Sequence, residues 1–191
     1  MDNLMNFKQE IHQLLDRGMH SDAKAKIKEK LKQLILEDEN SFLYLAEYAG
    51  FLIDIGSEAL DEEAASLGVK LLQSNETDLK SVVSEQSFNY CLANGMDALY
   101  KIQEKDTGFP TLEMIRPNLA NAKNYYYKAF IAIDLKEINH LDLQILTNLG
   151  NNLSRAGRII DSIRLYKVVL HAHPGFPQAS AGLAYSLDKW L

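Results

Sequence analysis

Cysteine, proline and glycine are all scarce in this sequence. Cys91 is the only cysteine, and the 191 residues include four prolines and ten glycines. A single cysteine cannot form a disulfide within the chain or a Cys-x-x-Cys redox or metal motif. Long stretches without proline or glycine favour helices over strands joined by tight turns. The composition therefore predicts an all-α protein without a disulfide or a cysteine-based metal site.

Long apolar runs and a leader peptide are also missing. The longest purely apolar run, Ala129 to Ile133, is far shorter than the roughly 20 residues that span a bilayer. Met1 to Lys8 contains acidic and amide residues and lacks the apolar core of a signal peptide. We therefore expect a cytoplasmic protein that makes no use of a membrane.

Positive charge is in deficit, and most of the deficit lies in one region. The formal net charge is −6, and residues 36–85 contain only two basic residues against twelve acidic ones. An acidic surface repels phosphate backbones, which disfavours nucleic acid as the main ligand. Lys24, Lys28 and Lys32 recur one turn apart. We interpret this basic ridge as a solvated face, with contact to an anionic partner as the alternative.

Apolar residues recur at helical spacing along almost the whole chain. Gly18 and Gly56 are expected to end the first and third helices, and Ser21 or Asp22 to cap the second. The third helix is apolar on nearly all sides, which favours packing among neighbours, with partial exposure to a partner as the alternative. Nine helices are expected, at about 7–15, 23–35, 40–55, 58–73, 79–103, 118–134, 141–156, 159–173 and 177–191.

The most specific pattern lies in residues 141–176. Large, small and aromatic residues follow one another there at fixed spacing: Leu146, Leu149, Gly150, Leu153, Ser162, Tyr166 and Pro174. This order resembles the 34-residue tetratricopeptide (TPR) motif. In such a motif Gly150 and Ser162 let two helices approach closely, and Tyr166 fills the space between them. The resemblance implies a TPR-like right-handed solenoid of stacked antiparallel helix pairs.

A second, weaker match to the same motif lies upstream. Ala122, Tyr126 and Ala129 follow the small–aromatic–small spacing of the family's second helix, and Leu92-Ala93 takes the place of the Leu-Gly pair. The distance between these two parts exceeds that of a standard repeat. We interpret residues 79–134 as an expanded repeat.

The resulting organisation is a single helical-repeat domain over residues 1–191. Residues 1–76 are interpreted as degenerate helix pairs, and residues 177–191 as a terminal capping helix, although a chain cut at a domain edge fits that last helix as well. The expanded repeat contains an expected irregular insertion at 104–117, where Pro117 suits the first turn of the helix that follows.

The resemblance also implies a concave groove, lined by the first helix of each pair, that accepts a peptide. Amide side chains suit this task because they can pair with a peptide backbone. Some TPR proteins hold a terminal carboxylate with lysines, but Thr147 stands where a lysine would be expected, so that mode is not predicted. The predicted groove residues, which should point away from the packing between helices, are Tyr90, Asn94, Asp97, Gln144, Thr147, Asn148, Asn151 and Arg155.

No catalytic, metal or cofactor site is predicted. His171 and His173 lie on different faces of a helix and have no carboxylates at metal-ligand spacing. Arg164 and His171 share a helix face at the spacing of a ribonuclease motif, but they lie on the helix at 159–173, whose role in helix packing already explains its sequence pattern. The tyrosines at 125–127 are assigned to packing and surface cover rather than to base stacking. The carboxylates between Glu58 and Glu63 are interpreted as a solvated helix start.

Together these features predict a non-catalytic scaffold that binds a protein or peptide partner, with no assignment of its oligomeric state. A fainter resemblance supplies the alternative. The stretch from Gln144 to Leu187 is similar to TPR segments that precede a HEPN-type ribonuclease domain in some bacterial proteins. That resemblance implies a regulatory or substrate-recognising role, with the catalytic domain following Leu191.

Overall fold

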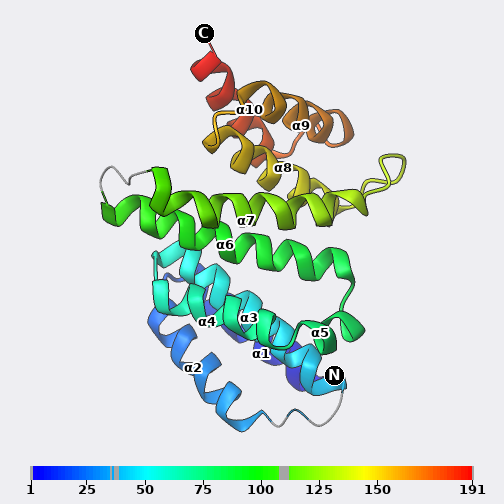
Figure 1. Ribbon diagram of the computed structural model, residues 1–191. Helices are drawn as coiled ribbons and strands as arrows, with labels where there is room; N and C mark the ends of the chain where they lie inside the picture. Colours follow the sequence, from blue (N-terminus) through cyan, green and yellow to red (C-terminus); the bar gives the residue numbers. More distant parts are fainter. Residues whose placement is uncertain (1, 35, 37–38, 108–111, 191) are drawn as a thin grey trace. The chain divides into compact units, whose positions relative to one another are not determined.

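The computed structural model describes residues 2–34, 36, 39–107 and 112–190, and within those ranges it contains ten α-helices and no strand (Figure 1). The expected all-α class is therefore confirmed for the described part of the chain. None of these helices is both long and apolar enough to cross a membrane. The helices are α1 (Asp2–Asp16), α2 (His20–Gln33), α3 (Glu39–Ala59), α4 (Glu62–Ser74), α5 (Glu76–Val82), α6 (Glu85–Thr107), α7 (Leu112–Ile131), α8 (His140–Arg155), α9 (Ile159–Ala172) and α10 (Pro177–Trp190).

The chain divides into two compact units whose boundaries fall inside α6 and α7. The N-terminal unit comprises residues 1–84 and 95–115, and the C-terminal unit comprises residues 85–94 and 116–191. The first turns of α6 thus belong with α8, α9 and α10. This division brings side chains near residue 90 into the same unit as side chains far later in the sequence.

Helix α3 is the centre of the N-terminal unit, where it contacts α1, α2, α4 and α5. Its side chains Tyr48, Phe51, Leu52 and Ile55 are buried in one cluster together with Phe7 of α1. Because these apolar side chains are buried among the neighbouring helices, the packed interpretation of α3 is confirmed.

The glycine expected to end this helix instead allows close packing within it. Gly56 lies inside α3, which continues to Ala59. A Cβ atom at Gly56 would lie 2.6 Å from the Cβ of Ala65 in α4. Gly68 of α4 allows the same close approach from the other helix, since a Cβ there would lie 2.8 Å from the carbonyl oxygen of Ala49 in α3. The expected helix end was wrong because the requirement for glycine comes from a neighbouring helix.

Charge pairing links α2 to the beginning of α4. It bears on two predictions, the basic ridge and the solvated acidic helix start. Lys24 donates to Asp61 and, over 3.2 Å, to Glu63, and Lys28 also donates to Glu63. His20 lies 3.2 Å from Glu58. The acidic helix start is therefore not simply solvated, and part of the basic ridge is engaged within the protein. Three-dimensional proximity between α2 and α4 creates these pairs, and the linear sequence does not show it.

Several helix ends differ from the expected ones. Met19 rather than Ser21 or Asp22 precedes α2, and no side chain caps that helix. The helix predicted to begin at about residue 79, or a few residues later, and to end at 103 corresponds to two helices, α5 and α6, separated by extended backbone at Val83. The expected insertion at 104–117 is helical over 104–107 and 112–117, with Pro117 inside α7, whereas residues 108–111 lie outside the described residues.

The C-terminal unit contains α8, α9 and α10, each in contact with the other two (Figure 1). The α8–α9 turn contains Gly157 with a positive φ of 78°, as expected. The ring of Tyr166 is buried against two glycines, because a Cβ at Gly150 or Gly182 would lie 2.7 or 2.6 Å from its atoms. The expected roles of Gly150 and Tyr166 in packing are confirmed.

Candidate functional site

A depression in the C-terminal unit gathers several of the predicted groove residues. Its volume is about 430 Å³. We call it the amide pocket, because three side-chain amides line it. The lining comes from the first half of α6, from α8, and from the α9–α10 connection and the first turn of α10. Its lining residues are Tyr90, His140, Gln144, Thr147, Asn148, His173, Gly175, Phe176, Pro177 and Gln178.

Helix α8 positions three of these side chains on one face. Gln144, Thr147 and Asn148 are spaced three and four residues apart, so they project from the same side of the helix. The start of α8 is fixed by a capping box. Asn139 accepts from the backbone of Asp142, and the Asp142 side chain accepts from the backbone of Asn139. Gln86 of α6 also donates to Asp142 over 2.8 Å, which ties the beginning of α6 to α8.

Asn148 is held in one orientation by a hydrogen-bond network beneath the pocket. Its Nδ2 donates to the hydroxyl of Tyr90 over 3.0 Å and to Oδ1 of Asn94 over 3.1 Å. The Asn94 oxygen also accepts from the hydroxyl of Tyr126, at 2.7 Å. Both N–H groups of Asn148 are thus used within the protein. Its oxygen has no hydrogen-bond partner among the described residues and remains available to a ligand.

The other two predicted residues on this face of α8 behave differently from each other. Thr147 is 2% exposed, and its hydroxyl donates to the carbonyl oxygen of Leu143 over 2.7 Å. This hydroxyl is therefore satisfied within the helix, and Thr147 contributes shape rather than a donor. Gln144 is half-buried and has no side-chain hydrogen bond to any residue that the structure describes. Gln144 and Asn148 are the α8 amides that can meet a ligand.

Four predicted groove residues do not line this pocket, and one of them, Asn94, belongs to the network described above. Oδ1 of Asn151 accepts from the hydroxyl of Tyr166 over 2.7 Å, so this oxygen takes part in α8–α9 packing. Asp97 is 6% exposed, belongs to the N-terminal unit and pairs with Lys101 at 3.3 Å. Arg155 is exposed in the last turn of α8 and does not line the pocket.

Two histidines and a phenylalanine form the part of the pocket that the sequence did not indicate. The ring of Phe176 lies 6.0 Å from the ring of His140 and 6.0 Å from that of His173, measured between centroids. Phe176 itself is 7% exposed and belongs to the core cluster of the C-terminal unit. These residues come from a helix start and a connecting segment, where helical periodicity gives no signal. Their proximity follows from the return of the chain after α9.

The pocket lacks fixed charge. Its lining contains no Asp, Glu, Lys or Arg, so only the histidines can give it charge. Such a site offers nothing to compensate a phosphate or a metal ion beyond the imidazoles, but amides can donate to and accept from a neutral peptide group. The arrangement favours an uncharged polar ligand with an apolar side chain to place against the rings.

The residues considered for catalysis, Arg164 and His171, lie on α9 and do not line the amide pocket. Arg164 has a 75% exposed side chain, and its Nη1 is 3.6 Å from Asp161. His171 lines a different depression from the amide pocket. Tyr126 is 1% exposed, which confirms its assignment to packing.

Comparison with family models gave no match, and no curated protein that was compared with the chain is similar to it.

Proposed function

We propose that this chain is a non-catalytic protein-interaction scaffold, and that the amide pocket binds an extended peptide segment of its partner. The observation that carries this proposal is the convergence of Gln144, Asn148 and Gln178 on one depression that contains no fixed charge. The helix pair α8–α9 with its TPR-like motif supports a TPR-like solenoid as the framework for that role.

The chemistry of the pocket matches that of a peptide backbone. A side-chain amide carries the same donor and acceptor as a peptide group, so each pocket amide can pair with one peptide unit. Each such hydrogen bond contributes a net of about 0.5–1.5 kcal/mol. The oriented oxygen of Asn148 is an acceptor that needs no rearrangement on binding.

The size of the pocket sets the length of the bound segment. About 430 Å³ falls at the lower end of the ~300–1,000 Å³ typical of small-ligand sites. The pocket therefore accepts a short stretch of peptide, with one side chain against Phe176 and the histidine rings. Contact with the rest of the partner falls on the surrounding surface.

Gln144→Leu tests this function most directly. The substitution keeps the size of the side chain and removes a donor and an acceptor that the described part of the fold does not use. We expect partner binding, once a partner is identified by affinity capture and mass spectrometry, to weaken about threefold to tenfold by calorimetry. The melting temperature should stay nearly unchanged.

The matched control is Gln73→Leu, an exposed glutamine in the N-terminal unit. It should leave both affinity and melting temperature unchanged. Equal affinities of wild type and Gln144→Leu would contradict the assignment of the amide pocket as the contact site.

A further inference from the structure

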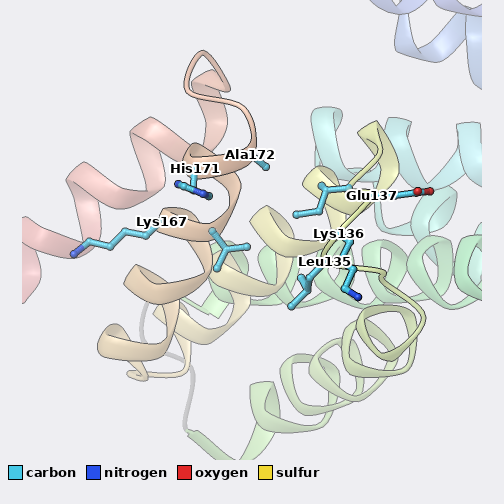
Figure 2. A pocket seen from close by; sticks show the side chains of 8 residues that line it. Leu135, Lys136, Glu137, Lys167, His171 and Ala172 are labelled. Carbon is cyan, nitrogen blue, oxygen red and sulfur yellow. The ribbon is translucent and has the colours of Figure 1, made fainter.

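A second depression in the C-terminal unit differs in chemistry from the amide pocket and shares no residue with it. It lies between the α7–α8 connection and the second half of α9 and has a volume of about 670 Å³ (Figure 2). We call it the basic-rimmed depression. Its lining residues are Leu135, Lys136, Glu137, Ile138, Lys167, Val168, His171 and Ala172.

The apolar part of the lining, which we call its floor, consists of Leu135, Ile138, Val168 and Ala172 and is partly open to solvent. Leu135 is 60% exposed and Val168 is 37% exposed. Ile138 packs against the core cluster of this unit, so the floor continues a folded interior rather than a mobile tip. Exposed aliphatic side chains grouped in one depression mark a surface that gains free energy when a partner covers it.

Two lysines, Lys136 and Lys167, form the basic part of the lining, which we call its rim. Neither has an ion pair with any described residue, and the imidazole of His171 beside them has none either. In contrast, Lys24 and Lys28 of the N-terminal unit are both paired with carboxylates. Glu137 is the single acid in the lining, and Figure 2 shows its carboxylate turned away from α9.

We propose that the basic-rimmed depression docks a short acidic segment of a protein partner, in which Asp or Glu residues flank a leucine-like side chain. The aliphatic residue would cover Leu135 and Val168, and the carboxylates would meet the ammonium groups of Lys136 and Lys167 and a ring N–H of His171. Charge complementarity selects this occupant, because a basic segment would be repelled by the same rim. A nucleic acid would satisfy the rim but would leave the aliphatic floor without a matching group.

The test selects random dodecapeptides displayed on phage against the 191-residue chain, with a parallel selection against Val168→Asp. We expect the wild type to enrich peptides that combine Asp or Glu with Leu, Ile or Phe. The affinity of a synthetic copy, measured by fluorescence anisotropy, should fall at least tenfold in Val168→Asp. It should fall severalfold in the double variant Lys136→Glu, Lys167→Glu.

Ile160→Asp is the matched control, since Ile160 is 45% exposed on the same helix and does not line the depression. It should bind the peptide as the wild type does. The proposal is overturned if both selections enrich the same peptides, if no acidic peptide is enriched, or if Ile160→Asp weakens binding as much as Val168→Asp. It is also overturned if a single-stranded RNA oligonucleotide binds in place of acidic peptides and the double lysine variant abolishes that binding.

Discussion

At the scale of single residues, Gly56 marks the closest approach of α3 and α4. We expect Gly56→Ala to lower the free energy of unfolding, because the new methyl group would meet backbone atoms of Ala65 at 2.7 and 2.8 Å. Overpacking of this kind costs about 1–3 kcal/mol. The gain in helix propensity, about 0.5–1 kcal/mol, is smaller. Urea unfolding measures the difference.

Gly175→Ala serves as the control for this substitution, since the nearest atom to its new methyl group would be a His173 ring carbon at 3.8 Å. A change within about 0.5 kcal/mol is expected there. If Gly56→Ala were as stable as the wild type, the close α3–α4 approach would be refuted.

Asn94 is the second residue on which local structure depends, because its oxygen accepts from both Tyr126 and Asn148. Asn94→Leu would remove this acceptor from Tyr126 and from Asn148, at a cost of about 0.5–1.5 kcal/mol for each hydrogen bond lost. Asn94→Asp keeps an acceptor for both donors, so it should retain more stability at neutral pH. Thermal unfolding of the two variants compares them, and equal losses would show that the hydrogen bonds contribute nothing.

At the scale of elements, the contact between α2 and α4 depends on charge. The hydrogen bond to Asp61 raises the pKa of Lys24 above 10.5, against the opposing effect of burial. Burial by itself would raise the pKa of Asp61, but the hydrogen bonds from Lys24 and from the backbone of Ala64 lower it below 3.8. Each partner therefore stabilises the charged form of the other.

The stabilising effect of this pair should depend on pH in a defined window. The contribution of Asp61, whose folded pKa is lowered, is present above its unfolded pKa and is lost as pH falls through the folded value. The contribution of Lys24, whose folded pKa is raised, is present below its unfolded pKa and is lost as pH rises through the folded value.

Lys24→Met should therefore be less stable than the wild type between about pH 4 and pH 10. The expected loss is on the order of 1 kcal/mol, because the pair is only partly shielded from water. Urea unfolding at a series of pH values measures the gap, which should narrow towards both extremes. A gap that stays constant with pH would indicate lost packing of the lysine side chain instead of lost charge pairing.

At the scale of the whole molecule, two compact units imply two regions of distinct local stability. We expect Gly56→Ala to accelerate amide hydrogen exchange mainly in α3 and α4. Asn94→Leu should accelerate it mainly in α7 and α8, where the partners of Asn94 lie. Exchange measured by mass spectrometry separates these cases. Equal acceleration along the whole chain in both variants would show one cooperative unit.

Several elements could be predicted from the sequence because their causes are local. The bounds of α8 and α9 follow from apolar spacing and from the turn at Gly157, and the class of the fold follows from periodicity and the lack of turn residues. The role of Tyr166 follows from a spacing that places an aromatic side chain between two helices. The separation of α5 from α6 was not predicted, because the sequence has no proline or glycine beside Val83 to indicate a break between helices.

In the candidate site, too, some residues could be predicted from the sequence and others could not. Tyr90, Gln144, Thr147 and Asn148 could be named in advance, because spacing along a helix assigns side chains to a face. Asn151 does not line the pocket, and its hydrogen bond from Tyr166 could not be predicted, because the side on which Tyr166 approaches α8 is decided by the crossing of two helices.

By itself, then, the sequence determined the helices and the faces they present, since these depend on residues three or four positions apart. Only the tertiary structure decided which faces meet. It brought Asn94 beneath Asn148, set His140 and His173 beside Phe176, and paired Lys24 with Asp61. Those contacts join residues far apart in the chain, and packing between helices selects them.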